Sequence, residues 1–292
     1  MEGDEARVTY LQRAIGYSLT GDTSERALFV LHGKGKTGKS TLLAVVSELV
    51  GDFAMRTPTE TLMHKQNEGI PNDIAKLRGA RFVFASEGED GKRLAESLIK
   101  DLTGEDRIAA RFMRQEWFEF TPTFKIWFST NHRPVIRGTD DAIWGRVKLI
   151  PFNVRFSPAE QRPKYVVLAE FRAELPGILA WAVRGCLAWQ KDGLKEPEAV
   201  RAASVEYRAD MDTLGAWMVD ECMEIPFATQ GAASLYENYK HWTENNGEKP
   251  VTNKAFAAQL AERGFQKKRM TKGVSYSGIR LKDPSEKNSA AE

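Results

Sequence analysis

The stretch LFVLHGKGKTGKSTLL, residues 28–43, determines which fold the rest of the chain has to build. An apolar run leads into a glycine-rich loop, and apolar residues then recur at helical spacing. Within the stretch, Gly33, Gly38, Lys39 and Ser40 satisfy the pattern G-x-x-x-x-G-K-[ST]. The order strand, glycine-rich loop, helix is the structural context in which this pattern forms a phosphate-binding loop.

The chemistry of such a loop explains these residue types. Glycines let backbone N–H groups close around phosphate oxygens, and the following helix directs its positive N-terminus at the same anions. Lys39 is expected to reach the β- and γ-phosphates of ATP, and Ser40 to offer its hydroxyl to Mg²⁺. The alternative is a glycine- and lysine-rich turn without a ligand. The predicted nucleotide-binding residues are Gly33, Lys34, Gly35, Lys36, Thr37, Gly38, Lys39, Ser40 and Thr41.

The surrounding sequence alternates strand-like and helix-like segments, which predicts an α/β architecture. The strand-like segments are apolar almost throughout, as expected of a parallel sheet covered on both faces. A longer helical region follows at 158–210. The predicted strands are 27–31, 81–86, 124–130 and 147–152, and the predicted helices before them and between them are 5–19, 40–50, 73–77 and 92–102.

Three polar residues stand at the ends of predicted strands or just before one. Glu87 follows one strand and Asn131 another, and Arg146 precedes the last strand. Because ligands of parallel sheets bind at the carboxyl ends of the strands, Glu87 is a candidate Mg²⁺ ligand and Asn131 a candidate contact of the γ-phosphate. Glu89 is a weaker candidate acid. The alternatives are a solvated carboxylate, a turn-forming asparagine and an arginine in a surface ion pair.

These motifs together resemble a known family. The segments NDIAKLRGARFVFASE, LIKDLTGEDRIAARF and FTPTFKIWFSTNHRPVIRGTDDAIWGRVKLIPF are similar, in order and spacing, to the ATPase domain of superfamily 3 helicases. The phage and plasmid primase-helicases, which are related to the poxviral primase-helicase, are the best match. The resemblance is strong over residues 27–155 and looser towards the C-terminus.

The resemblance implies a role for each matching residue. Lys39 and Ser40 correspond to the Walker A residues, and Glu87 to the Walker B acid. Asn131 corresponds to the sensor asparagine, and Arg146 to the arginine finger that enters the neighbouring subunit's site. The implied catalytic residues are thus Lys39, Glu87, Asn131 and Arg146, with Ser40 and Glu87 on the metal.

Two departures from the family pattern bear on these roles. Many superfamily 3 members have two adjacent acids at the Walker B position, whereas Ser86 precedes Glu87 here. The family often has two arginines where this chain has Gly145 and Arg146. Arg137 is therefore held in reserve as an alternative finger.

The segment RIAARFMRQEWFEFTP, residues 107–122, reads as a hairpin with a charged tip. In the resembling helicases a hairpin at this place contacts single-stranded DNA in the central channel of a ring. Cationic and aromatic side chains suit a phosphate track with stacked bases. Arg107, Arg111 and Arg114 are the candidates, with Lys100 nearby; the alternative is a packed hairpin with a solvated face.

The C-terminal region reads as helix, helix, helix, strand, turn, strand, which suggests a winged helix. Residues 251–281 hold seven Lys and Arg against the single acid Glu262, in a chain whose net charge is +2. A local basic excess is typical of nucleic-acid binding, and a protein-docking module is the alternative. The candidate DNA contacts here are Lys254, Lys267, Lys268 and Arg269.

We therefore expect a helical collar remnant at 1–20, an ATPase domain at 21–211, a winged-helix domain at 212–283 and a disordered tail at 284–292. Cys186 and Cys222 are the only cysteines, and no apolar run reaches the roughly 20 residues of a membrane span. The expected location is the cytoplasm of a bacterial host or of a virus-infected cell.

The leading interpretation is an ATP-driven DNA helicase motor that forms a ring, expected to be hexameric, in phage or plasmid replication. Its expected partners are single-stranded or forked DNA, further copies of the chain, and a primase or polymerase domain or partner. The first alternative is a DNA-binding ATPase that loads or remodels without unwinding. The second is a small-molecule kinase. No primase domain is recognisable before residue 20.

Overall fold

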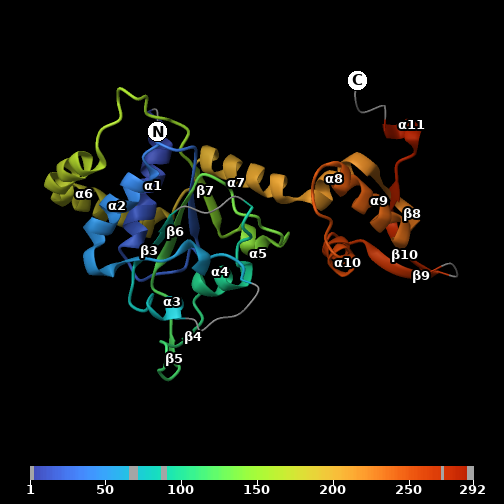
Figure 1. Ribbon diagram of the computed structural model, residues 1–292, viewed down its shortest axis with the longest axis horizontal. Helices are drawn as coiled ribbons and strands as arrows, with labels where there is room; N and C mark the ends of the chain where they lie inside the picture. The colour runs from blue at the N-terminus through green and yellow to red at the C-terminus, as the bar shows by residue number, and fades with distance from the viewer. Residues whose placement is uncertain (1–2, 66–71, 87–90, 271–272, 288–292) are drawn as a thin grey trace. The chain divides into compact units, whose positions relative to one another are not determined.

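The computed structural model describes residues 3–65, 72–86, 91–270 and 273–287. The chain divides into two compact units, Met1–Tyr207 and Arg208–Glu292, each described here by itself (Figure 1). Helix α7 (Glu198–Met211) runs through this division. No helix in the described ranges is long and apolar enough to cross a membrane.

The first unit is built on a five-stranded sheet with the strand order β2-β3-β6-β1-β7. All neighbouring strands pair in parallel, so the predicted α/β architecture with a parallel central sheet is confirmed. The four predicted strands are present, and β2 was missed because three residues are too few to show a pattern. The strands are β1 (Leu28–His32), β2 (Ala54–Arg56), β3 (Phe82–Ser86), β6 (Lys125–Thr130) and β7 (Val147–Pro151).

Helices α1 (Glu5–Ser18), α2 (Lys39–Val50) and α6 (Lys164–Asp192) cover one face of this sheet (Figure 1). The core beneath them is aromatic: the rings of Phe29 and Trp127 stack with centroids 4.4 Å apart. Each such buried ring contributes roughly 1.5–3 kcal/mol to the free energy of unfolding. The indole Nε1 of Trp127 donates to Ser18 Oγ at 3.0 Å, which satisfies its polar group.

Helices α1 and α6 approach each other closely at two glycines. A Cβ on Gly16 would lie 2.1 Å from the backbone nitrogen of Cys186, and one on Gly185 would lie 2.0 Å from the carbonyl oxygen of Gln12. No larger residue fits at either place, because the obstructing atoms are backbone. The N-terminal helix is therefore an integral layer of this unit.

The remaining helices of the first unit are shorter. Residues 92–95 were predicted to be helical, but Leu94 donates its N–H to Val135 O at 2.9 Å and Val135 donates to Lys92 O at 2.9 Å. This extended pairing competes with a helical turn, so the helix begins only at Glu96. The region predicted as helical from 158 contains α6 and α7, separated at Gly193, whose φ is 73°. The short helices are α3 (Asn72–Ala75), α4 (Glu96–Leu102) and α5 (Asp141–Trp144), with 3-10 turns at Gly51–Phe53 and Thr59–Thr61.

The second unit contains a three-stranded sheet of order β8-β10-β9 packed with helices. Its core includes Trp217, whose Nε1 donates to Asn238 Oδ1 at 2.7 Å. The elements are α8 (Thr213–Glu221), β8 (Cys222–Gly231), α9 (Ala232–Asn245), α10 (Asn253–Glu262), β9 (Gln266–Met270), β10 (Gly273–Leu281) and α11 (Pro284–Lys287).

Two predictions for this unit were wrong. Strand β8 was not expected between the first and second helices; it forms because β10 supplies an antiparallel partner, with Cys222 opposite Leu281. The tail was expected to be disordered from residue 284, but it begins with α11. Glu286 of this helix pairs with the guanidinium of Arg280 on β10 at 2.5 Å. Residues 288–292 lie outside the described ranges.

Candidate active site

The 33–40 loop connects β1 to α2, as predicted. Gly38, directly before α2, has a φ of 90°, a left-handed conformation that favours glycine. A Cβ on Gly33 would lie 2.1 Å from the carbonyl oxygen of Phe152, so the loop also requires glycine at its start. The first N–H groups of α2 are thereby directed towards the loop, an arrangement that attracts anions.

Lys39 is the central side chain of this loop. Its Nζ donates to Gly33 O at 2.6 Å, Lys34 O at 3.0 Å and Thr37 Oγ1 at 3.2 Å. It also donates to Asn131 Oδ1 at 3.1 Å. Only 6% of Lys39 is exposed, and burial lowers the pKa of its ammonium group. All four acceptors are neutral oxygens, so a phosphate anion would be a stronger partner for this cation.

Asn131 follows β6, which pairs with β1 so that Thr130 lies opposite His32. This register explains how Asn131 reaches Lys39 across 92 residues of sequence. The structure thus brings together two of the predicted catalytic side chains at the carboxyl ends of neighbouring strands.

The turn after Asn131 is held by the end of α7, a contribution that sequence reasoning missed. Arg133 forms an ion pair with Glu206 at 2.8 Å, and its guanidinium carbon lies 5.7 Å from the ring centre of Tyr207. The hydroxyl of Tyr207 donates to Pro134 O, and burial raises the pKa of this phenol. No local pattern indicates these contacts, because the partners are about 70 residues apart.

The predicted acid Glu87 and its weaker alternative Glu89 lie outside the described residues. The strand that precedes them ends at Ser86, which pairs with Ser129 two residues before Asn131. In the described ranges there is no cluster of three His, Cys, Asp or Glu that could hold a metal by itself. Mg²⁺ needs few protein ligands when phosphate oxygens complete its shell, and the exposed Ser40 has the hydroxyl for that role.

A cavity of about 1230 Å³ opens beside the loop. Its polar end is formed by residues 35–41 together with Ser129, Thr130 and Asn131. Its apolar walls include Val45 of α2, Phe156, and Trp181 of α6. The cavity therefore combines phosphate-binding groups with a surface on which a flat ring can pack. The wall from α6 was not predicted, since it comes from residues more than 100 positions beyond the loop.

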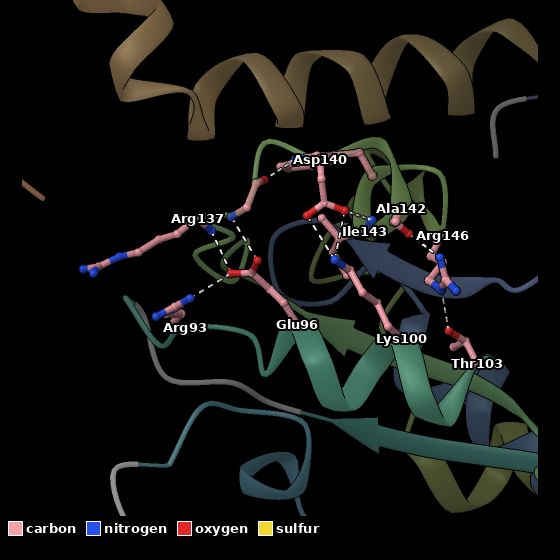
Figure 2. Close-up of polar contacts among 11 residues, drawn as sticks. Arg93, Glu96, Lys100, Thr103, Arg137, Asp140, Ala142, Ile143 and Arg146 are labelled. Atoms are coloured by element: carbon pink, nitrogen blue, oxygen red, sulfur yellow. Dashed lines mark hydrogen bonds and ion pairs between the residues drawn. The ribbon is translucent and has the colours of Figure 1, made fainter. Parts of the chain in front are cut away.

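Arg146 is not among the described residues that line this cavity, and its polar contacts are drawn in Figure 2. Its Nε donates to Thr103 Oγ1 at 3.0 Å, and one terminal nitrogen donates to Ala142 O. Burial lowers the pKa of its guanidinium. Neither Arg146 nor Arg137 is among the described residues that line the cavity.

The predicted hairpin is present: β4 (Ile108–Ala110) pairs antiparallel with β5 (Phe118–Phe120). Its tip exposes Met113 and Trp117, and Arg114 there adopts a φ of 61°. Arg111 stacks its guanidinium over Trp117, with the carbon 4.9 Å from the ring centre. Arg107 lies 3.8 Å from Glu119, and both of these side chains are largely exposed.

Lys100 does not join the hairpin tip. Its Nζ donates to both carboxylate oxygens of Asp140, at 2.9 and 3.0 Å (Figure 2).

The basic residues of the second unit are on its surface. Lys254 is exposed on α10, and Lys267, Lys268 and Arg269 are exposed on β9. Within the described ranges, none of the three β9 residues pairs with a carboxylate. Val274, opposite Arg269 on β10, is also exposed.

The chain is similar in sequence to a protein family and to viral proteins. A family model described as a family of unknown function, DUF5906, matches residues 31–146, which include Lys39, Asn131 and Arg146. The putative helicase L207/L206 of Acanthamoeba polyphaga mimivirus is 26% identical over 265 residues, covering 84% of this chain and 28% of the viral protein. Primase D5 of fowlpox virus is 26% identical over 145 residues, covering 48% of this chain and 18% of the viral protein.

The expected resemblance is therefore confirmed: homologues of this chain are putative helicases and primase D5 of large DNA viruses. The chain spans about 28% of the length of the mimivirus relative. Among solved structures, the NrS-1 C-terminal region matches with a TM-score of 0.47 and 11% identity, covering 95% of this chain and 75% of that one.

Proposed function

We propose that this relative of viral helicases is the motor of an ATP-driven DNA helicase of superfamily 3. The observation that carries the proposal is the hydrogen bond between Lys39 Nζ and Asn131 Oδ1, at 3.1 Å, at the edge of the cavity. It joins the two groups that such a motor needs at the γ-phosphate: a cation, and an amide that can also hold a water molecule.

In this proposal the 33–40 loop is a P-loop that binds ATP through backbone N–H groups. Lys39 leaves its loop oxygens for the β- and γ-phosphates, and Ser40 and Glu87 hold Mg²⁺. When bound, the metal supplies charge neutralisation at the phosphates. Glu87 also polarises the attacking water, and the apolar walls at Phe156 and Trp181 hold the base.

The proposed motor works as a ring, with six subunits expected. Arg146 lies away from its own cavity, which fits an arginine that completes the site of a neighbouring subunit. An arginine finger can raise the rate of phosphoryl transfer by about 10³–10⁵. Hydrolysis then requires assembly, because no single subunit holds a complete site.

Two surfaces are proposed to hold DNA. The hairpin, with Arg111 and Arg114 towards its tip and Arg107 at its base, contacts single-stranded DNA, helped by the exposed Trp117. In residues 212–283 we propose that α8, β8, α9, α10, β9 and β10, in this order, form a winged helix with β9 and β10 as the wing. Lys254 and the basic β9 residues supply its phosphate contacts.

Two other functions remain as alternatives. A DNA-binding ATPase that loads or remodels without unwinding would share every site residue, and strand separation on a forked substrate distinguishes it from a helicase. A small-molecule kinase would need an acceptor site and a lid. The exposed basic strand β9 favours a nucleic-acid partner over a small acceptor.

The test is the rate of ATP hydrolysis with and without single-stranded DNA, with the mass of the protein measured in the same buffer. The unaltered chain should hydrolyse ATP faster when DNA is present, as an assembly larger than one chain. Lys39→Ala should abolish hydrolysis in both conditions while the protein stays folded. Near-normal turnover in folded Lys39→Ala protein would contradict the proposal.

A further inference from the structure

Helix α4 and its C-cap Thr103 carry three polar side chains on one side that all contact residues 137–146 (Figure 2). Glu96, Lys100 and Thr103 are spaced four and three residues apart, so they lie on one side of the helix. Their partners lie within residues 137–146, the segment that ends at Arg146. The helix therefore contacts this segment at three successive points.

Glu96 fixes the start of the segment. Its Oε1 accepts the N–H of Arg137 at 3.0 Å, and its Oε2 accepts the N–H of Gly138 at 2.9 Å. A Cβ on Gly138 would lie 2.3 Å from Oε2, so a larger residue there would displace this carboxylate oxygen. Trp144 Nε1 donates to Gly138 O at 2.7 Å, which ties the same turn to α5.

Lys100 fixes the middle of the segment. Its ammonium holds Asp140, which is also the N-cap of α5 and accepts the N–H of Ile143 at 3.1 Å. Burial raises the pKa of Asp140, but the Lys100 hydrogen bond and the N–H groups outweigh it, so the net shift is downward. The carboxylate is thus charged at neutral pH, and α5 begins at a position set by α4.

Thr103 fixes the end of the segment. Its hydroxyl donates to Ile99 O at 2.6 Å, so its lone pairs are directed away from the helix and accept from Arg146 Nε at 3.0 Å. Ala142 O accepts from one terminal nitrogen of Arg146. The other terminal nitrogen has no hydrogen-bond partner within the described residues and is left for an anion.

We infer that Thr103 and Lys100 are positioning residues that set the guanidinium of Arg146 for the phosphates of a neighbouring subunit's ATP. The inference rests on the function proposed above. It gives Lys100 a role different from the DNA contact expected from sequence. A guanidinium anchored at Nε and one terminal nitrogen loses few rotamers when it meets phosphate, so its charge is already in place.

Thr103→Val tests this role, because valine keeps the shape and removes the acceptor. We expect kcat for ATP to fall about tenfold or more, while nucleotide affinity measured by direct binding stays within about twofold of the unaltered chain. Thr103→Ser restores the hydroxyl and should recover most of the lost kcat. A loss caused by poor folding would instead lower nucleotide binding together with the midpoint of thermal unfolding.

The double variant Thr103→Val/Arg146→Ala separates positioning from other effects. If Thr103 acts through Arg146, the double variant should turn over as slowly as Arg146→Ala alone. Full kcat in Thr103→Val beside a slow Arg146→Ala would overturn the inference and leave the role of Arg146 intact, and so would additive losses in the double variant. A fully active Arg146→Ala would overturn the proposed role of Arg146 itself, and the inference with it.

Thr103 is buried, so a second pair of variants guards against a folding defect. Lys100→Met removes the cation that holds Asp140, and Lys100→Arg keeps it. At this more exposed position we expect Lys100→Met to lower kcat in the same direction as Thr103→Val, and Lys100→Arg to lower it less. Equal kcat in Lys100→Met and the unaltered chain would overturn the positioning role inferred for Lys100, whatever Thr103→Val shows.

Discussion

At the scale of single residues, Lys39 and Asn131 show what the sequence could specify. The loop pattern identified Lys39, and the position of Asn131 after an apolar strand identified the amide. Their contact at 3.1 Å follows from a parallel register that places Thr130 opposite His32. Lys100, which is predicted to contact DNA, also pairs with Asp140. The sequence did not indicate this contact, because a basic residue in a charged motif does not reveal which carboxylate the fold brings to it.

Lys125 is a buried cation that no motif predicted. It is 2% exposed on the central strand β6, and its Nζ donates to Thr20 O at 2.6 Å and Asp22 O at 3.0 Å. The Nζ also lies 4.5 Å from the ring centre of Tyr17. Lys125 therefore ties the connection between α1 and β1 to the sheet.

This burial predicts a dependence of stability on pH. Desolvation lowers the pKa of Lys125 from 10.5 to about 7 in the folded chain. Between these values the unfolded chain binds a proton that the folded chain does not, so the free energy of unfolding should rise as pH rises from about 7 towards 10. Urea unfolding at pH 7 and pH 9 measures this rise in the free energy of unfolding, with Lys125→Met as the control. An equal rise in Lys125→Met would assign the effect to other groups.

At the scale of elements, strands with continuous apolar runs were predictable, and strands defined by their partner were not. The strands β1, β3, β6 and β7 are buried on both faces, so each is recognisable from its own continuous apolar run. Strand β8 contains Pro226 and, among the described residues, pairs only with β10, about 50 residues later. Its sequence alone does not distinguish it from a linker, since the partner provides the hydrogen bonds.

The β4–β5 hairpin gives the first prediction at this scale. Arg114→Ala should weaken binding of single-stranded DNA and lower the DNA-stimulated part of ATP hydrolysis, because it removes an exposed cation at the tip. Fluorescence anisotropy with a labelled single strand measures the affinity, and the rate without DNA is the internal reference. Exchange of Arg172, an exposed arginine paired with Glu48, for alanine is a matched control. If Arg114→Ala and the Arg172 control both bind the single strand as tightly as the unaltered chain, the tip does not hold DNA.

Strand β9 gives the second prediction at the scale of elements. Replacing Lys267, Lys268 and Arg269 together by alanine should weaken binding of forked DNA and flatten its dependence on salt. Each phosphate contact adds roughly one unit to the slope of log affinity against log salt concentration. Titrations at several salt concentrations measure the slope. An unchanged slope would point to a protein partner for this strand.

At the scale of the whole molecule, the chain has two compact units, and the predicted site residues described in the first unit do not all share one cavity. Its cavity holds Lys39 and Asn131, while Arg146 lies elsewhere on the same unit. The resemblance to helicases predicts a role for each of these three residues. It could not show which of them share one cavity, because that depends on the packing of α4 and α5 around Arg146.

Mixing two inactive variants tests whether neighbouring subunits complete each other's sites. Arg146→Ala should bind ATP and hydrolyse it poorly, and Lys39→Ala should not hydrolyse it. In an equal mixture, about a quarter of the interfaces in a closed ring would pair an intact loop with an intact Arg146. ATP hydrolysis should therefore partly return in the mixture, with mixed assembly verified by mass. No recovery in verified mixed rings would contradict a site completed by the neighbour and leave Arg146 acting within its own chain.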